Sequence, residues 1–151
     1  MKGVEFLLSH KEGKKYVLII GCGRLGASLA NEIYSQGNDV CIIDRDRDAF
    51  CKLDSSYGGL TENADATDVE VLNDVRAGKA DCIILVTDND NVNIMTAQIA
   101  ADLFRTEKIV CRLYDPEKEC IDVYKRQVLA APCTGNSALP AFGHCGGNAV
   151  P

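Results

Sequence analysis

The sequence predicts an α/β domain built on a doubly wound parallel sheet, and three observations indicate this fold. The apolar run Tyr16–Ile20 leads directly into a glycine-rich turn and a helical pattern. Further apolar runs follow, and segments with helical spacing separate them along the chain. The second run ends at a carboxylate, Asp44, at about the 20-residue distance from the turn that is typical of a dinucleotide-binding unit. Strands that alternate with helices in this way form parallel sheets through right-handed crossovers.

The first unit is a strand, a turn and a helix. Gly21, Gly23 and Gly26 have G-x-G-x-x-G spacing. We assign the tight turn to Gly21, the close approach of a pyrophosphate to Gly23, and the close packing of helix and strand to Gly26. The N–H groups and the positive dipole end at the start of the helix would then face the phosphates. The helix is expected to run to Gly37, with apolar positions at helical spacing: Leu25, Leu29, Ile33 and Tyr34.

The later elements alternate in the same way. The run 39–44 predicts the second strand, since continuous apolar runs are typical of parallel strands covered on both faces. A short helix is expected over 46–53, with Phe50 and Leu53 on its buried face, and a third strand starts at Leu60. Val69, Leu72 and Val75 predict a third helix that ends at Gly78. The remaining predictions are a central strand at 81–87, a helix at 90–104 and a fifth strand at 108–113.

The composition changes after the fifth strand. Residues 128–151 contain no Asp, Glu, Lys or Arg, but three of the four prolines in the chain. Such a segment has too few large apolar residues to form an element. We therefore expect a leader at 1–14, a single Rossmann-like domain at 15–119, and an atypical, irregular tail at 120–151 that is disordered or foreign to the domain.

Length and charge limit the classes of protein that this chain can represent. With 151 residues and 46% hydrophobic residues, it is expected to form one globular domain in the cytosol. A net charge of -6 argues against a nucleic-acid binder, and no apolar run is long enough to insert into a membrane. The eight cysteines include no C-x-x-C pair, so neither a zinc site nor a disulfide framework is expected.

Two residues beside the glycines suggest more specific chemistry. An acid at Asp44 would accept hydrogen bonds from both ribose hydroxyls and repel a 2'-phosphate, which favours NAD(H) or an adenine nucleotide over NADP(H). Arg45 weakens that exclusion slightly, because a guanidinium can bind a phosphate. Cys22 lies in the turn near a helix N-terminus, where a thiolate is favoured, so redox sensing is a further hypothesis.

With these residues in place, the chain resembles the TrkA/KtrA family of RCK domains, the regulators of potassium conductance that are also called KTN domains. The resemblance covers about residues 15–119 and rests on five blocks in order. These are Gly21-Cys-Gly-Arg-Leu-Gly26, Asp44, Asp65-Ala-Thr-Asp68, Val86-Thr-Asp-Asn-Asp-Asn-Val-Asn93 and Val110-Cys-Arg-Leu-Tyr-Asp115. The sequence from Cys120 onward departs from the family, whose members continue with a helix, a further strand and often a second subdomain.

The resemblance implies a nucleotide site for NAD(H), ATP or ADP. It implies that the amides of the turn hold the phosphates, that Asp44 holds a ribose, that Asp65, Ala66 and Thr67 border the adenine, and that Thr87 and Asn93 lie near the phosphate end. Arg24 would sense the terminal phosphate, because an arginine there has this role in nucleotide-gated members. The candidate binding residues are Gly21, Cys22, Gly23, Arg24, Leu25, Gly26, Asp44, Arg45, Asp65, Ala66, Thr67, Thr87 and Asn93.

The resemblance also implies a function. Domains of this family are cytoplasmic, non-enzymatic regulators that pair into homo-oligomers and control a potassium-translocating membrane subunit. We therefore expect a regulatory subunit at the inner face of the cell membrane, with no catalytic or metal-binding residues. The alternative is a fragment of an NAD-dependent oxidoreductase, which would need a proton donor beside the nicotinamide. Both histidines, His10 and His144, fall outside the predicted domain.

Overall fold

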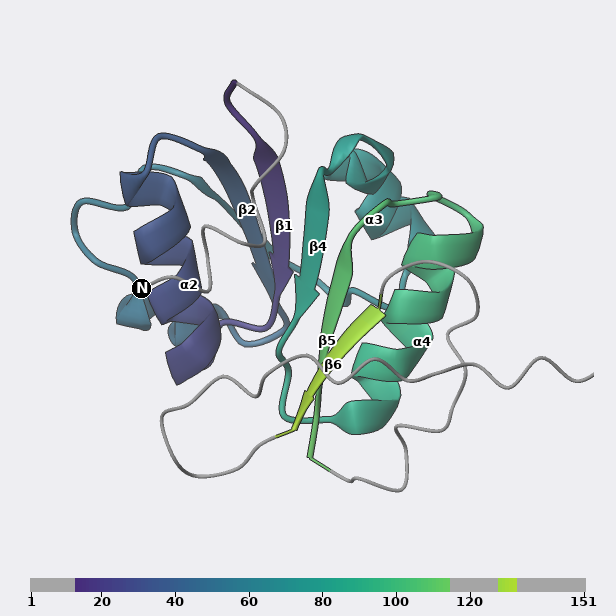
Figure 1. Cartoon of the computed structure of the whole chain (residues 1–151). Helices are drawn as coiled ribbons and strands as arrows, with labels where there is room; N and C mark the ends of the chain where they lie inside the picture. The colour runs from purple at the N-terminus through teal and green to yellow at the C-terminus, as the bar shows by residue number, and fades with distance from the viewer. Residues whose placement is uncertain (1–12, 115–127, 133–151) are drawn as a thin grey trace, which may run out of the picture.

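The computed structural model describes residues 13–114, and residues 128–132 at the level of the backbone. Strands and helices alternate through most of this part of the chain (Figure 1). The elements in order are β1 Tyr16–Ile20, α2 Arg24–Ser35, β2 Asp39–Asp44, the 3-10 helix η1 Arg47–Lys52, β3 Leu60–Asn63, α3 Val69–Asp74, the 3-10 helix η2 Ala77–Lys79, β4 Cys82–Leu85, α4 Asp90–Asp102, β5 Ile109–Leu113 and β6 Val128–Pro132.

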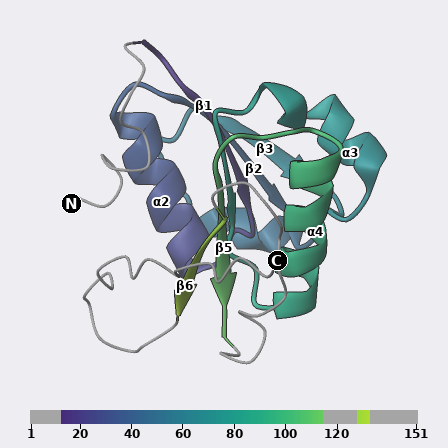
Figure 2. The same cartoon turned by 45° about the vertical axis from the view of Figure 1, so that its right-hand side comes forward.

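The described strands form one parallel sheet in the order β3-β2-β1-β4-β5-β6. The strand order therefore reverses direction after β3, where the chain returns from one edge to place β4 on the other side of β1. Helix α2 covers one face of the sheet, and α3 and α4 cover the other (Figures 1 and 2). This arrangement confirms the predicted doubly wound, Rossmann-like α/β fold.

Alternate residues of the central strand supply two separate cores. Leu18 and Ile20 of β1 pack in a cluster with α3 and α4, whereas Val17 and Ile19 pack in a cluster with α2. All four side chains are at most 1% exposed. A strand covered on both faces has no polar side to place in water, which is why the sequence of β1 is continuously apolar. In the described part of the chain, no helix combines the length and the apolar character needed to cross a bilayer.

Three local predictions need correction. The segment after β2 forms the 3-10 helix η1 with Ala49 as its buried residue, while Phe50 and Leu53 are only partly buried against the same core. Leu25, expected on the buried face of α2, is 43% exposed because it lies in the first turn of the helix, at the open end of the sheet. The helix predicted at 90–104 ends at Asp102, and Leu103 after it is 62% exposed.

The structure also contains a strand where the composition predicted no further element. Residues Val128–Pro132 form β6, which pairs in parallel with β5 from Ile109↔Val128 to Leu113↔Pro132. A strand at the edge of a sheet is held by backbone pairing to one neighbour, so it does not require the large apolar side chains of a central strand. The other residues of the predicted tail and nearly all of the predicted leader lie outside the described residues, and the proposed domain boundaries stay a prediction.

Candidate nucleotide-binding site

A cleft of about 750 Å³ lies along the carboxyl ends of the parallel strands. In open α/β sheets, ligands bind at this edge, at the point where the strand order reverses, which here falls between β1 and β4. The cleft is lined by residues from five strand ends, from the turn between β1 and α2, from η1 and from the start of α4: Ile20, Gly21, Cys22, Gly23, Arg24, Leu25, Ile43, Asp44, Arg45, Asp46, Ala49, Lys52, Ala64, Asp65, Ala66, Val86, Thr87, Asp88, Asn89, Val92, Arg112 and Tyr114.

The three glycines of the turn Gly21–Gly26, called here the phosphate turn, have different surroundings. Gly21 has a φ of +105° and lies so close to β4 that an added Cβ would be 2.8 Å from the peptide nitrogen of Thr87. At Gly26 a Cβ would lie 1.8 Å from the carbonyl oxygen of Gly21, so α2 can approach the turn only without a side chain there. A Cβ on Gly23 would meet nothing within 4 Å, so this position is open toward the cleft.

The N-terminus of α2 carries no internal cap. Gly23 is its N-cap residue and provides no side-chain hydrogen bond, and the first turn of the helix contains no acidic residue. By contrast, Asp68 caps α3 and Asn89 caps α4 through their side chains. The first N–H groups of any α-helix have no partner within the helix. Those of α2 are therefore available to a phosphate, which the helix dipole also favours.

Asp44 ties the phosphate turn to the end of β2. Its Oδ2 accepts a hydrogen bond of 2.6 Å from the peptide N–H of Cys22, and its Oδ1 accepts one of 2.8 Å from Asp46 N–H. Each carboxylate oxygen has a second lone pair, so both can still accept a bond from a ribose hydroxyl. The acid is therefore held by the backbone in the position that the spacing predicts.

Asp65 and Arg45 border the same end of the cleft. Oδ1 of Asp65 accepts hydrogen bonds from the peptide N–H and the hydroxyl of Thr67, at 2.9 and 2.8 Å. Its other oxygen lies 3.7 Å from the guanidinium of Arg45. These bonds, and secondarily the Arg45 charge, hold the pKa of the Asp65 carboxyl below its ordinary value. Thr67 itself does not line the cleft and acts on it through Asp65.

Thr87 lines the cleft at the end of β4, whereas Asn93 does not. The side chain of Asn93 is fully buried, and its amide oxygen accepts hydrogen bonds from the peptide N–H and the hydroxyl of Thr87. Of the thirteen candidate residues, ten line the cleft together, and Gly26, Thr67 and Asn93 lie behind it. Which of them contact a ligand stays a prediction.

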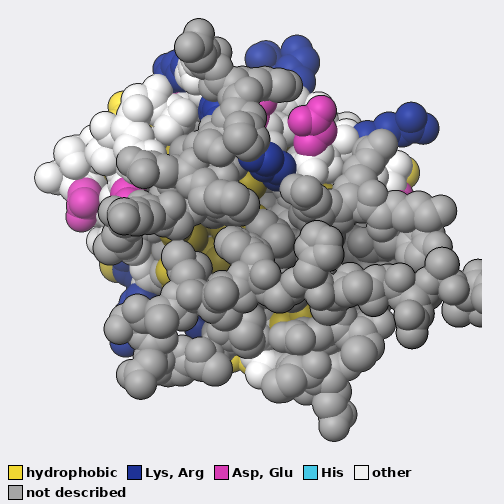
Figure 3. Space-filling model, viewed as in Figure 1, with side chains coloured by type: hydrophobic (Ala, Val, Ile, Leu, Met, Phe, Trp, Pro, Cys, Tyr) yellow, Lys and Arg dark blue, Asp and Glu magenta, His cyan; other side chains and the backbone are white. Residues whose placement is uncertain are grey.

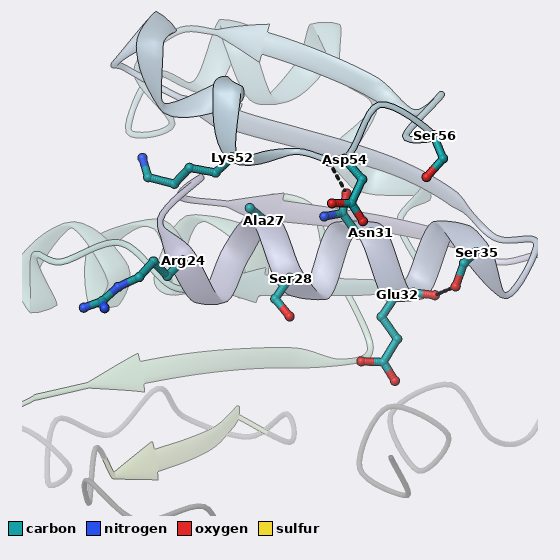
Figure 4. A pocket seen from close by; sticks show the side chains of 9 residues that line it. All are labelled: Arg24, Ala27, Ser28, Asn31, Glu32, Ser35, Lys52, Asp54 and Ser56. Atoms are coloured by element: carbon teal, nitrogen blue, oxygen red, sulfur yellow. Dashed lines mark hydrogen bonds between the residues drawn. The ribbon is translucent and has the colours of Figure 1, made fainter.

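Sequence reasoning missed several lining residues that come from separate elements. Lys52 at the end of η1 lines both the cleft and a shallower groove along α2, and so does Arg24. Figure 4 shows these two cationic side chains extending from the same end of that groove, at the start of α2. Arg112 and Tyr114 lie at the far end of the cleft, with the guanidinium carbon 4.4 Å from the ring centroid. Arg112 belongs to the last of the five sequence blocks that carry the family resemblance, but its position at the cleft follows from the order of the strands in the sheet.

The charges around the cleft differ from those of the whole chain. Four cationic and four acidic side chains line it, so it is neutral although the chain carries a net charge of -6. The described side chains on the face in Figure 3 likewise include both signs. An anion with a polar, ribose-like part would meet both kinds of partner here, because cations bind phosphates and acids accept from hydroxyls.

The hypothesis of a reactive thiolate at Cys22 is wrong. The Cys22 side chain is fully buried, and its thiol donates a weak hydrogen bond of 3.5 Å to the carbonyl oxygen of Ala49. Burial, and secondarily the charge of Asp44, raise the pKa of this thiol to about 11. Desolvation of the charged form thus outweighs the attraction of the helix N-terminus. The five cysteines among the described residues are all free thiols.

The fold and the cleft together define a Rossmann-like domain of the nucleotide-binding class. The chain belongs to the TrkA-N domain family, whose model matches residues 17–130. This match confirms the family that the sequence blocks indicated.

Curated relatives carry the name of a potassium uptake protein. The Trk system potassium uptake protein TrkA of Streptomyces coelicolor is 36% identical over 111 residues, which are 74% of this chain and 49% of that protein. The protein of the same name from Vibrio alginolyticus is 33% identical over 101 residues, 67% of this chain and 22% of that protein. The chain thus spans half or less of the length of these two relatives.

Solved structures show the same fold. The RCK domain of GsuK has a TM-score of 0.61 and 25% identity, over 78% of this chain and 25% of that one. The TrkA-N domain of the inner membrane protein ybaL from Escherichia coli has a TM-score of 0.67 and 18% identity, over 83% of this chain and 90% of that one. The GsuK channel bound to NAD has a TM-score of 0.59 and 20% identity, over 76% of this chain and 22% of that one.

Proposed function

We propose that this chain is the nucleotide-binding domain of a cytoplasmic regulatory subunit of a potassium uptake system of the Trk or Ktr type. The observation that carries the proposal is the uncapped N-terminus of α2, which opens into the cleft beside the unobstructed Gly23. Free helix N–H groups favour an anion there, and Asp44 beside them favours a sugar hydroxyl. A nucleotide is the ligand that carries both groups.

The ligand that fits these residues is NAD(H) or an adenine nucleotide such as ATP or ADP. The N–H groups at the start of α2 would hold the phosphates, with Arg24 and Lys52 beside them as cations. Asp44 would hold a ribose, and Asp65 would border the adenine. The GsuK channel, which has this fold, has been solved bound to NAD, and this supports NAD as one candidate.

The regulatory role would rest on differential binding. A nucleotide can shift a pair of domains between two arrangements only if it binds one arrangement more tightly. The domain would act as a homo-oligomer on a potassium-translocating membrane subunit, at the inner face of the membrane and without inserting into it. The names of the curated relatives support potassium uptake as the process that is controlled.

One observation keeps an enzymatic alternative open, namely a fragment of an NAD-dependent oxidoreductase. Tyr114 lines the far end of the cleft, and Lys118 follows it in Tyr-x-x-x-Lys spacing, an arrangement that can supply a proton donor beside a nicotinamide. Lys118 lies outside the described residues. The names of the relatives favour the regulatory role, since they describe potassium uptake.

The test is a calorimetric titration of the full chain with AMP, ADP, ATP, NADH and NADPH, repeated with Arg24→Ala. Loss of a cation beside the terminal phosphate should weaken the binding of ATP more than the binding of NADH. The difference should be about tenfold if one charge-assisted hydrogen bond is lost. Lys79→Ala is the matched control, because Lys79 is an exposed cation in η2, which precedes β4 and so lies at the opposite edge of the sheet.

Each result bears on a separate part of the proposal. If the unmodified chain binds none of these nucleotides, the proposed function is wrong. If Arg24→Ala lowers the affinity for ATP and for NADH equally, Arg24 does not recognise a terminal phosphate. Hydride exchange between bound NADH and a small carbonyl compound would instead support the oxidoreductase alternative.

A further inference from the structure

A groove between α2 and the segment after β2 opens from the cleft. One of its walls is α2 from Arg24 to Ser35, and the other consists of Lys52, Asp54 and Ser56 (Figure 4). This hollow, called here the α2 groove, has a volume of about 570 Å³. Arg24 and Lys52 line both the groove and the cleft, so the two hollows meet at these two cations.

The geometry of η1 directs Lys52 toward the phosphate turn. Side chains three residues apart lie on the same face of a 3-10 helix. Lys52 therefore shares a face with Ala49, which is buried and whose carbonyl oxygen accepts the hydrogen bond from the Cys22 thiol. Ala49 and Lys52 are also the two residues of η1 that line the cleft. Burial and the charge of Asp44 raise the pKa of the Cys22 thiol, and the charge of Lys52 acts against them, which agrees with a position close to the turn.

The two cations at this junction differ from the acids beside them in their partners. Within the part of the chain that the structure describes, neither Arg24 nor Lys52 makes a side-chain hydrogen bond or an ion pair, and both residues are exposed. In contrast, Asp46 caps η1 by accepting a hydrogen bond from the N–H of Asp48, and both oxygens of Asp44 accept backbone N–H groups. Two such cations side by side favour an anion with more than one charge, such as a phosphate group.

The α2 groove lies on the ribose side of the cleft. Its walls belong to α2, which leads into β2, and to the segment that follows β2, and no residue of β4 or β5 lines it. Asp44 at the end of β2 bonds to the N–H of Cys22, the residue beside which Lys52 lies. A ribose held by Asp44, with its 5'-phosphate at the phosphate turn, would therefore present its hydroxyls to the junction of the two hollows. A group added to the 2'- or 3'-hydroxyl would extend past Asp44 into the mouth of the groove.

We propose that Lys52 and Arg24 form a subsite for a second phosphate group, carried on the 2'- or 3'-hydroxyl of the bound nucleotide. This inference rests on the proposed nucleotide-binding function. The sequence alone predicts that Asp44 repels a 2'-phosphate, but the structure sets two exposed cations against this one acid. The ligand class is a nucleotide with phosphates at two positions of its ribose, of which NADP(H) and adenosine 3',5'-bisphosphate are examples.

The experiment compares AMP with adenosine 2',5'-bisphosphate and adenosine 3',5'-bisphosphate in calorimetric titrations of the full chain. These ligands differ from AMP only by the added phosphate. The unmodified chain should bind at least one bisphosphate as tightly as AMP or more tightly, and the isomer that it prefers identifies the hydroxyl. Lys52→Ala should lower the affinity for that bisphosphate about tenfold more than the affinity for AMP, the equivalent of one charge-assisted hydrogen bond. Lys79→Ala, the matched control, should change neither affinity.

A titration of Lys52→Ala with ATP separates this subsite from one for the 5'-phosphate chain. If Lys52→Ala weakens the binding of ATP as much as that of the preferred bisphosphate, Lys52 serves the 5'-chain and the inference is overturned. Equal losses of bisphosphate and AMP affinity would overturn it as well, and so would an unmodified chain that binds both bisphosphates tenfold more weakly than AMP, because repulsion by Asp44 would then prevail. If the unmodified chain binds none of these nucleotides, the proposed function itself is overturned.

Discussion

The peptide N–H of Cys22 donates a hydrogen bond of 2.6 Å to Oδ2 of Asp44, so the phosphate turn and the end of β2 are joined by the carboxylate that we expect to bind a ribose. The same carboxylate therefore has a structural role and a proposed binding role. Substitution of Asp44 removes both roles at once. A nucleotide that lacks only the 2'-hydroxyl of the ribose can separate the binding role from the structural role.

We expect Asp44→Ala to abolish discrimination between ATP and 2'-deoxy-ATP. The unmodified chain should prefer ATP by about tenfold or more, because a hydrogen bond to a charged acceptor contributes about 1.5–3 kcal/mol. The variant should also lose about 1–3 kcal/mol of stability, since the N–H of the buried Cys22 loses its acceptor. Parallel titrations and urea denaturation measure the two effects. A preference for ATP that persists in the variant would assign the ribose to another residue.

Two glycines of the phosphate turn should respond to alanine in opposite ways. Gly23→Ala adds a methyl group where nothing lies within 4 Å, at a backbone φ of -75° that alanine adopts readily. We expect it to cost less than about 1 kcal/mol of stability but to obstruct phosphate binding. Gly26→Ala places a carbon 1.8 Å from the Gly21 oxygen and should cost about 3 kcal/mol or more.

Thermal unfolding and nucleotide titration of the two glycine variants provide the comparison. Gly23→Ala should unfold near the temperature of the unmodified chain and bind ATP poorly. Unimpaired ATP binding by Gly23→Ala would show that the phosphates do not approach the backbone at this position. A Gly26→Ala variant as stable as the unmodified chain would contradict the close packing of α2 against the turn.

Cys22 should react with iodoacetamide far more slowly than Cys51. With a pKa of about 11, the Cys22 thiol is ionised in about one molecule in a thousand at pH 8. Burial limits access further, whereas Cys51 is exposed. Peptide mass spectrometry after brief alkylation measures both positions in the same sample. Labelling of Cys22 should accelerate as the pH rises toward 11. Equal labelling of the two cysteines at pH 8 would contradict a buried Cys22 thiol with a raised pKa.

The carboxyl of Asp65 should titrate below its ordinary range, and Thr67→Val should raise its pKa. In the folded chain the N–H and hydroxyl of Thr67 stabilise the charged form. A pKa that is lowered by folding contributes stability above the ordinary aspartate value of about 3.9, and this stability is lost as the pH falls through the lowered pKa. The stability difference between the two proteins should thus be present at pH 7 and disappear as the pH falls through the lowered pKa of Asp65. Carbon-detected NMR titration measures the pKa, and an unchanged Asp65 pKa in Thr67→Val would contradict the assignment.

The sequence by itself determined the order of the elements and the phosphate turn. Continuous apolar runs such as 17–20 and 82–85 predict strands covered on both faces, and the G-x-G-x-x-G spacing predicts the turn, because these patterns follow from local steric and solvation rules. The position of Asp44 followed in the same way from its distance along the chain. The edge strand β6 was missed because its short run, Val-Leu-Ala-Ala-Pro, has only two large apolar side chains, whereas its place in the sheet comes from backbone pairing with β5.

Only the tertiary structure decided what surrounds the turn. The sheet order brings Arg112 and Tyr114 to the cleft from about 90 residues beyond it, and no local pattern carries that information. It also placed Asn93 behind Thr87 rather than in the cleft, and buried the Cys22 thiol that the helix N-terminus alone would have ionised. The physical reason is the same in each case: the desolvation and the hydrogen-bond partners of a side chain depend on neighbours that are distant in the sequence.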